Sequence, residues 1–162
     1  MQGDMTEANI GRCPSCNAAV YGGIDACREF FESLLGQEYT AYRFAKVHRM
    51  MVDAYALQHP AEYMKSGKSF AAHLTGALAV IEHDDAETVN RMVQTWLSSN
   101  PAIERPADPT PPYGSLTVLD CFEENDPDKY RQVVRQWLES AWQAWADYHE
   151  LAHHLIARAG VR

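Results

Sequence analysis

The distribution of proline constrains the fold of this 162-residue chain more than any other feature of its sequence. Five of the eight prolines lie within residues 99–114, whereas the segments on either side are long and nearly free of proline. Proline interrupts a helix because it lacks the backbone N–H and its ring clashes with the preceding turn. The sequence therefore predicts a long, irregular, proline-rich loop over residues 99–125 with helices before and after it.

Apolar residues recur at helical spacing through most of the remaining chain. We expect five helices, over residues 25–36, 40–59, 68–82, 86–98 and 127–158. Gly36 and Pro60 are expected to end the first two, because glycine terminates helices and the residue before a proline leaves the helical region. The predicted fold is all-α: one domain over residues 1–162, a bundle of about five helices with an irregular N-terminal metal-binding knuckle in residues 1–23.

Composition narrows the classes of partner. The formal net charge is −8, which disfavours nucleic acid and anionic membranes, and the apolar fraction of 46% is ordinary for a globular protein. No apolar run is long enough to span a bilayer, and the first twelve residues contain no apolar segment typical of a secretory signal. We therefore expect a cytoplasmic protein whose partner is a small molecule or another protein, and a homo-oligomer remains compatible with the sequence.

Two cysteines separated by two residues form the clearest chemical motif. Cys13 and Cys16 flank Pro14 in CPSC, a spacing that lets two thiolates of one turn face a single tetrahedral ion. Cys27 is the next thiol along the chain, and Cys121 has no evident mate. Zinc binding is the leading interpretation, with a redox pair and unligated thiols as alternatives.

A zinc site needs a fourth ligand, which histidine can provide. His48 and His59 lie on one face of the helix expected over residues 40–59, but eleven residues separate them by about 16 Å along the axis, so they cannot share an ion. If the first two helices are antiparallel and joined near Gly36, Cys27 lies level with about residue 52, which is closer to His48. The same helix is expected to place Arg49 and Asp53 on its solvent side as an i,i+4 ion pair.

These estimates predict a metal site at one end of the bundle. Its leading ligand set is Cys13, Cys16, Cys27 and His48. The residues kept as alternative ligands, or as members of an adjoining polar pocket, are His59, His73 and Tyr55.

The last helix carries a second, weaker metal candidate. The segment 149–153 reads HELAH and matches the zinc-protease motif H-E-x-x-H, in which two histidines one turn apart bind the metal. Only nine residues follow His153, which leaves little room for the usual third ligand. Together with an inward histidine of an earlier helix, His149 and His153 resemble in spacing the three-histidine site of the DinB/YfiT-like metal-binding bundles. That resemblance implies a metal-dependent hydrolase or transferase.

A longer resemblance covers nearly the whole chain. The marks that carry it are CPSC at 13–16, Cys27, His48-Arg49, Asp53, Tyr55, Gln58-His59-Pro60, His73-Leu74, the 114–118 segment GSLTV and the tryptophans before His149. In these marks the chain resembles a bacterial family of unknown function. The resemblance implies a small cytosolic helical protein, adds weight to the cysteines with His48, His59 and His73 as a group, and supplies no mechanism.

The sequence thus favours a zinc-binding helical protein of unknown biological role, in which a structural metal ties the N-terminal segment to the bundle. The alternative is a metal-dependent hydrolase or transferase with a histidine site, and a structural or oligomeric protein without a site is the third interpretation. Whether the protein is an enzyme stays open at this point.

Overall fold

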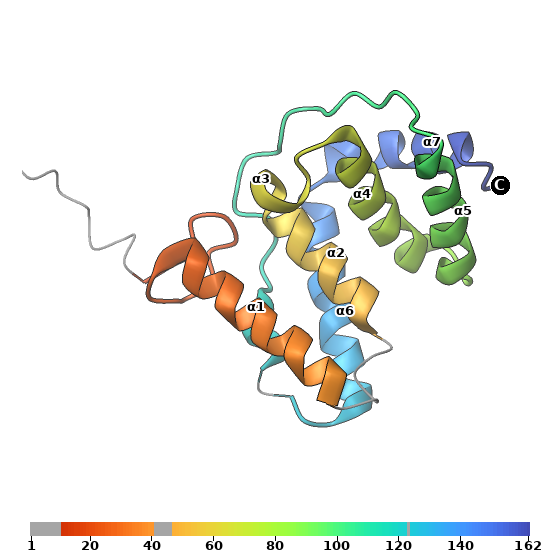
Figure 1. Ribbon diagram of the computed structural model, residues 1–162. Coiled ribbons are helices and arrows are strands. Elements are labelled where there is room, and N and C mark those ends of the chain that lie inside the picture. The colour runs from red at the N-terminus through yellow and green to blue at the C-terminus, as the bar shows by residue number, and fades with distance from the viewer. Residues whose placement is uncertain (1–10, 41–46, 123) are drawn as a thin grey trace, which may run out of the picture.

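The computed structural model describes residues 11–40, 47–122 and 124–162 (Figure 1). The helices are α1 (Gly23–Thr40), α2 (His48–Gln58), α3 (Pro60–Tyr63), α4 (Gly67–Glu82), α5 (Ala86–Ser98), α6 (Pro127–Gln143) and α7 (His149–Arg158), with the short 3₁₀ helices η3 (Val118–Cys121) and η4 (Ala146–Tyr148). The described residues contain no strand. The predicted all-α bundle with an irregular N-terminal segment is confirmed. No helix in the described part of the chain is both long and apolar enough to cross a membrane.

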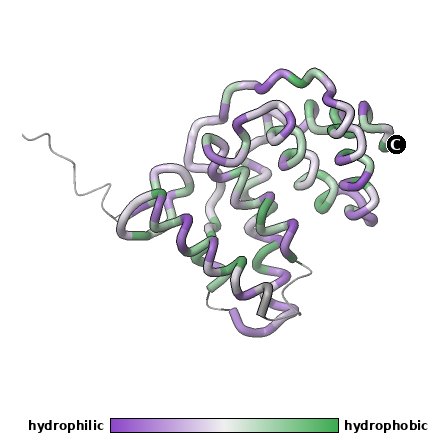
Figure 2. The backbone as a smooth tube through the Cα atoms, viewed as in Figure 1, coloured by the Kyte–Doolittle hydropathy of each residue, from purple (hydrophilic) through white to green (hydrophobic). Residues whose placement is uncertain are grey.

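Helix α2 lies at the centre of the bundle. It packs against α6, α4 and α1, and its second half is buried on every side (Figure 1). Hydrophobic and hydrophilic residues alternate along the surrounding helices, as expected for elements with one buried face (Figure 2). The expected ion pair between Arg49 and Asp53 is present, but the expectation that it faces solvent is wrong, since Asp53 is fully buried beneath α4.

The first helix is longer than the sequence indicates. Gly36 was expected to end it, yet α1 continues through Gly36 to Thr40. A single glycine inside a helix costs only about 1 kcal/mol, which the contacts of α1 with α2 and η3 outweigh. The next helix was expected to begin at Thr40, whereas α2 begins at His48. Residues 41–46 of that expected helix lie outside the described residues.

The single helix expected over residues 127–158 is broken into α6, η4 and α7. The break centres on Trp145, whose fully buried indole Nε1 donates a hydrogen bond to the carbonyl of Leu57 at 2.9 Å. Its backbone (φ −102°, ψ 22°) departs from the helix. Because the chain turns there, α7 packs against α4 rather than continuing the line of α6 (Figure 1).

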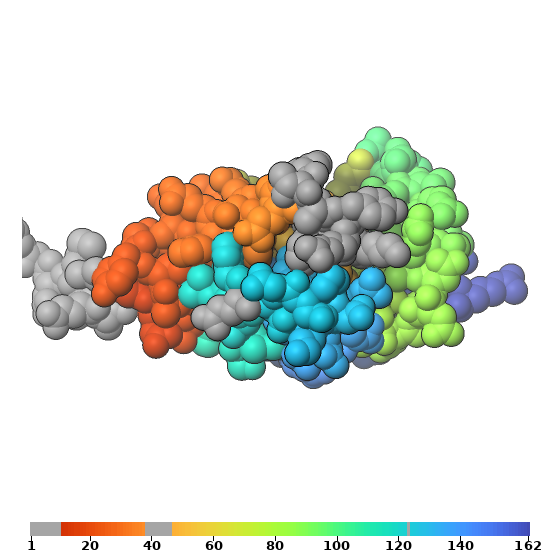
Figure 3. Space-filling view, turned by 90° about the horizontal axis from the view of Figure 1, so that it is seen from below, coloured from red at the N-terminus to blue at the C-terminus, as the bar shows by residue number. Residues whose placement is uncertain are grey.

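The proline-rich segment has no helix from Asn100 to Thr117, after which η3 forms within the range expected to be a loop. One buried side chain anchors it: Gln58, the last residue of α2, donates from Nε2 to the carbonyls of Tyr113 (2.9 Å) and Leu116 (2.7 Å). The Oε1 of Gln58 accepts a hydrogen bond from Trp137 Nε1 at 2.8 Å. Helix η3 then contacts both α1 and α6 (Figure 3). The loop is therefore fastened to the core at both its middle and its end.

Candidate metal centre

Three separate elements bring four buried side chains together at the end of the molecule where α1 begins. Cys13 and Cys16 come from the N-terminal loop, Cys27 from the start of α1, and His59 from the junction of α2 and α3. Each is at most 2% exposed. The three Sγ atoms and a ring nitrogen of His59 all lie within 4.8 Å of one another.

The distances match the edges of a tetrahedron around a zinc ion. His59 Nε2 lies 3.6 Å from the Sγ of Cys13 and 3.6 Å from the Sγ of Cys27, and the Sγ atoms of Cys16 and Cys27 are 3.6 Å apart. Zinc–sulfur bonds of about 2.3 Å and zinc–nitrogen bonds of about 2.05 Å imply S···S edges of about 3.8 Å and S···N edges of about 3.6 Å. The four residues are therefore arranged as a Cys3His set that is compatible with metal binding.

A tight turn positions the first two thiols. The backbone N–H of Cys13 donates to the carbonyl of Ala18, and the N–H of Asn17 donates to the carbonyl of Cys13, both at 2.8 Å. Asn17 has φ 66°, a left-handed conformation that asparagine tolerates better than most residues. The Ser15 hydroxyl donates to the carbonyl of Gln58 at 2.6 Å. This last hydrogen bond fixes the CPSC turn to the end of α2, directly beside His59.

The orientation of His59 is set by helix α2. The helix ends at this residue because Pro60 follows it, and His59 Nδ1 lies 2.9 Å from the carbonyl oxygen of Tyr55. A carbonyl only accepts hydrogen bonds, so Nδ1 carries the proton and the lone pair of Nε2 faces the sulfurs. Metal-bound histidines commonly donate their other ring N–H to a carbonyl or carboxylate in the same way.

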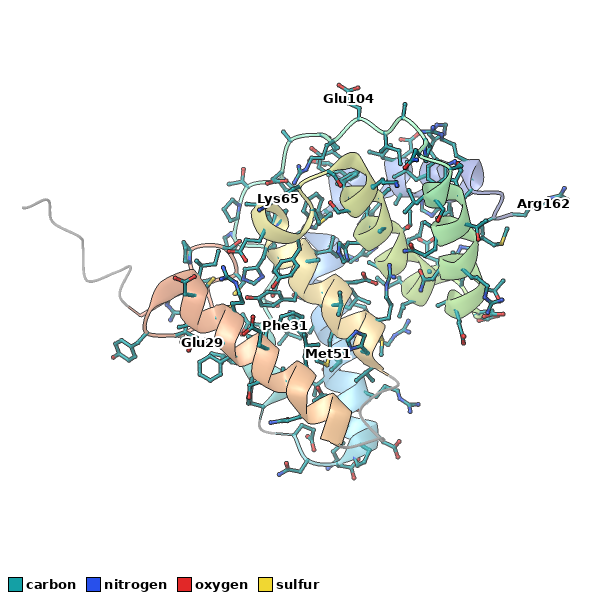
Figure 4. The ribbon with its side chains drawn as sticks, viewed as in Figure 1. Glu29, Phe31, Met51, Lys65, Glu104 and Arg162 are labelled. Carbon is teal, nitrogen blue, oxygen red and sulfur yellow. The ribbon has the colours of Figure 1, made fainter. Side chains whose placement is uncertain are left out.

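Aromatic stacking holds the ring in place. The Tyr55 ring stacks on His59 at a centroid distance of 3.8 Å and on Phe31 at 3.9 Å. Figure 4 shows Phe31 projecting from α1 toward α2. The Tyr55 hydroxyl donates to the Sγ of Cys27 at 3.6 Å. Burial raises the pKa of Tyr55, so this phenol stays protonated and remains a donor.

The three thiols share hydrogen bonds in the absence of an ion. The hydrogen bond from Cys16 lowers the pKa of Cys13, and the hydrogen bonds made to Cys13 raise the pKa of Cys16 and of Cys27. A divalent cation bound here would displace the protons of these cysteines, since bound cysteines are thiolates.

The structure brings together the three predicted cysteines but completes the set with His59, the alternative, rather than with His48. The estimate from the sequence assumed a short turn between Gly36 and Thr40. Because α1 ends at Thr40 and α2 begins at His48, the midpoint of the connection lies near residue 44. An antiparallel partner of Cys27 then falls at about residue 61, next to His59. His48 is exposed at the start of α2.

The other predicted residues are placed as follows. Tyr55 lies against the cluster as a stacking partner, whereas His73 is hydrogen-bonded to Asp53 on a different side of α2.

The histidines of the HELAH segment lie on α7. His149 stacks on Trp142, and its Nε2 lies 2.9 Å from the carbonyl oxygen of Trp142. That nitrogen must therefore be protonated and cannot bind a metal. His153 Nε2 lies 2.5 Å from a carboxylate oxygen of Glu82. Neither histidine of HELAH belongs to a metal-holding group among the described residues.

A known protein family matches this chain. The family described as "Family of unknown function (DUF5946)" matches residues 11–146, which is most of the chain. The chain belongs to this family. The predicted resemblance to a family of unknown function is thereby confirmed. The matched region contains all four residues of the Cys3His set and ends before the HELAH segment. Neither the curated proteins nor the solved structures contain a significant match.

Sequence reasoning missed the polar contacts that support the centre. No local pattern in the sequence assigns partners to the Gln58 side chain or links Ser15 to the Gln58 carbonyl. A signal was present, because Gln58 precedes His59 and Pro60 at the end of an otherwise apolar helix. A buried amide at such a position needs hydrogen-bond partners from another part of the fold.

Proposed function

We propose that this protein is a zinc-binding helical protein in which Cys13, Cys16, Cys27 and His59 hold one zinc ion as a closed structural site. The observation that carries the proposal is the tetrahedral spacing of four buried ligand atoms, all within 4.8 Å of one another. Zinc is favoured over other ions because three thiolates and one imidazole are ligands that zinc prefers, in the geometry it prefers.

A structural role is supported by the position of the site. Its ligands come from an irregular loop, a helix start and a helix end, so the ion would tie residues 11–22 to the bundle. Four protein ligands leave no position for water or substrate, which favours a structural metal over a hydrolase or transferase centre. Three bound thiolates also suit a reducing compartment such as the cytoplasm.

Metal analysis of the purified chain tests the proposal. We expect about one zinc per chain, and after replacement by Co²⁺ we expect the absorption bands of a tetrahedral cobalt–thiolate complex. Cys13→Ala and His59→Ala should each lower the bound zinc strongly, because each removes one of four ligands.

Two matched variants separate a specific loss from a general one. Cys121→Ala removes the fourth cysteine, which is buried but outside the cluster. His48→Ala removes the exposed histidine at the start of α2. Both should retain one zinc. A wild-type protein without metal, or zinc loss in His48→Ala with zinc retained in His59→Ala, would contradict the ligand set.

A further inference from the structure

A second polar cluster joins α2 to α4, on residues that the Cys3His set does not use. The Asp53 carboxylate is fully buried, and its Oδ2 accepts a hydrogen bond from Arg49 Nε at 2.8 Å. Its Oδ1 lies 2.9 Å from His73 Nδ1. Arg49 Nη2 also donates to the carbonyl of Ala72 at 2.8 Å. Burying a carboxylate costs several kcal/mol unless it is paired and hydrogen-bonded, so both oxygens require these partners.

Helix α4 is shaped around this cluster. A Cβ at Gly76 would lie 2.3 Å from Asp53 Oδ2 and 2.6 Å from Arg49 Nη2. Only the absence of a side chain at Gly76 allows the carboxylate and the guanidinium to lie against the helix backbone. The positions of Arg49 and His73 are therefore fixed by the fold rather than by flexible surface contacts.

Both side chains held by Asp53 line a cavity of about 380 Å³ between α2, α4 and α5. Its walls also include Lys68 and Ser69 at the start of α4, and Gln94 and Ser98 on α5. This volume suits a small organic molecule. No carboxylate is among the described residues that line the cavity, although the chain as a whole carries a net charge of −8.

The charges around the cavity favour an anion. Arg49 and Lys68 bring two positive charges, of which Asp53 behind the wall balances one. Lys68 Nζ uses one donor on Asn100 Oδ1 at 2.6 Å and keeps two others. Since a carboxylate only accepts, His73 Nδ1 carries a proton, and its Nε2 has no hydrogen-bond partner within the described part of the chain. His73 thus offers the cavity a ring nitrogen already fixed in direction.

We propose that this cavity binds a phosphate monoester, a small molecule whose oxyanion accepts hydrogen bonds from Arg49, from Lys68 and from the imidazolium form of His73, which donates through Nε2. Asp53 acts as a positioning residue, because it holds both the guanidinium and the imidazole from behind. A phosphate monoester carries close to two negative charges and accepts several charge-assisted hydrogen bonds at once, which matches two cations and an imidazolium better than a carboxylate does.

Calorimetric titration of the full chain with phenyl phosphate tests this site, with benzoate as a carboxylate probe carrying the same ring. Ionic strength is kept constant, since salt screens exposed charges. We expect saturable binding of phenyl phosphate and binding of benzoate that is weaker by about fivefold or more. The ¹⁵N resonance of His73 Nε2 should shift on binding, a signal that a purely structural histidine would not give.

Lysine variants supply the matched control. Lys68→Ala should weaken phenyl phosphate binding by about fivefold or more, whereas Lys65→Ala, which removes an exposed lysine three residues earlier, should leave it unchanged. Circular dichroism verifies that both variants fold. Absence of saturable binding to the wild-type chain, or equal weakening in the two lysine variants, overturns the proposal. Benzoate binding as tight as phenyl phosphate, with the same dependence on Lys68, overturns the assignment to phosphate monoesters.

Discussion

At Gly76, the backbone of α4 lies so close to Asp53 and Arg49 that a hydrogen atom is the largest side chain that fits. We predict that Gly76→Ala lowers the free energy of unfolding by about 1–3 kcal/mol, because the added methyl group must displace a buried ion pair. Urea denaturation measures the change. Gly36→Ala is the matched control: it also lies within a helix, but a Cβ there meets nothing within 4 Å. That variant should be as stable as the wild type or up to about 1 kcal/mol more stable. Equal stabilities of the two variants would contradict the close contact.

The Gln58 side chain has three hydrogen-bond partners in the core. Gln58→Ala would leave the Trp137 indole N–H and the carbonyls of Tyr113 and Leu116 without their hydrogen bonds. We predict a loss of about 3 kcal/mol in the free energy of unfolding, since each unsatisfied buried group costs about 1–3 kcal/mol. Gln136→Ala, an exposed glutamine of α6, is the control and should change stability by less than about 0.5 kcal/mol. A Gln58→Ala protein of normal stability would show that the loop is not held there.

At the scale of helices, the joint between α4 and α7 carries a titratable contact. The hydrogen bond to Glu82 raises the pKa of His153 above the ordinary value for histidine. A group whose pKa is raised by folding stabilises the fold below its unfolded pKa, and loses that contribution as pH rises through the folded pKa. The ordinary pKa of an unfolded histidine is about 6.5. We therefore predict that the free energy of unfolding falls as the pH rises from below this value to above the raised pKa of His153 in the folded protein. Both side chains are more than 40% exposed, so screening keeps this fall below about 1 kcal/mol.

The pH dependence can be assigned by two variants of α7. His153→Gln should remove this fall in the free energy of unfolding, measured by urea denaturation at several pH values. His154→Gln, which changes the exposed neighbour, should retain it. A fall of the same size in His153→Gln would place its origin at another group.

Helix boundaries decided which parts of the site could be predicted. The three cysteines that the structure brings together could be grouped from the sequence, because the CPSC spacing and the third thiol are local signals that no packing detail alters. The choice between His48 and His59 depended on where α1 ends, and tertiary contacts carry α1 past Gly36 to Thr40. The break at Trp145 was also beyond sequence reasoning, because its cause is a hydrogen bond to Leu57 across the core.

At the scale of the whole molecule, the helical class followed from apolar periodicity and the distribution of proline. What could not be read from the sequence is how completely α2 is enclosed. Asp53 was expected in solvent because a charged residue usually is, but α4 and α6 cover the centre of the bundle from two sides. Pairing with Arg49 and His73 compensates the cost of burying the Asp53 carboxylate. The periodicity of apolar residues in one helix cannot predict a partner such as His73, which lies two helices away.

Metal binding should also be visible in the stability of the entire fold. A ligand that binds only the folded state raises the melting temperature with its concentration. We predict that the midpoint of thermal unfolding rises with added zinc and falls on chelation, and that Cys13→Ala shows neither response. Scanning calorimetry measures this. A wild-type midpoint that ignores both zinc and chelator would contradict a structural ion, whatever the metal content.

Gln58 and His59 are consecutive residues held from opposite directions. The side chain of Gln58 is hydrogen-bonded to the proline-rich loop and to Trp137, while Nε2 of His59 faces the cysteines. One peptide unit therefore works as a rigid link between a surface segment and the candidate metal centre. A force that lifts the loop away from the core therefore reaches the imidazole, so displacement of the loop would alter the geometry of the Cys3His set without direct contact to any of its four residues.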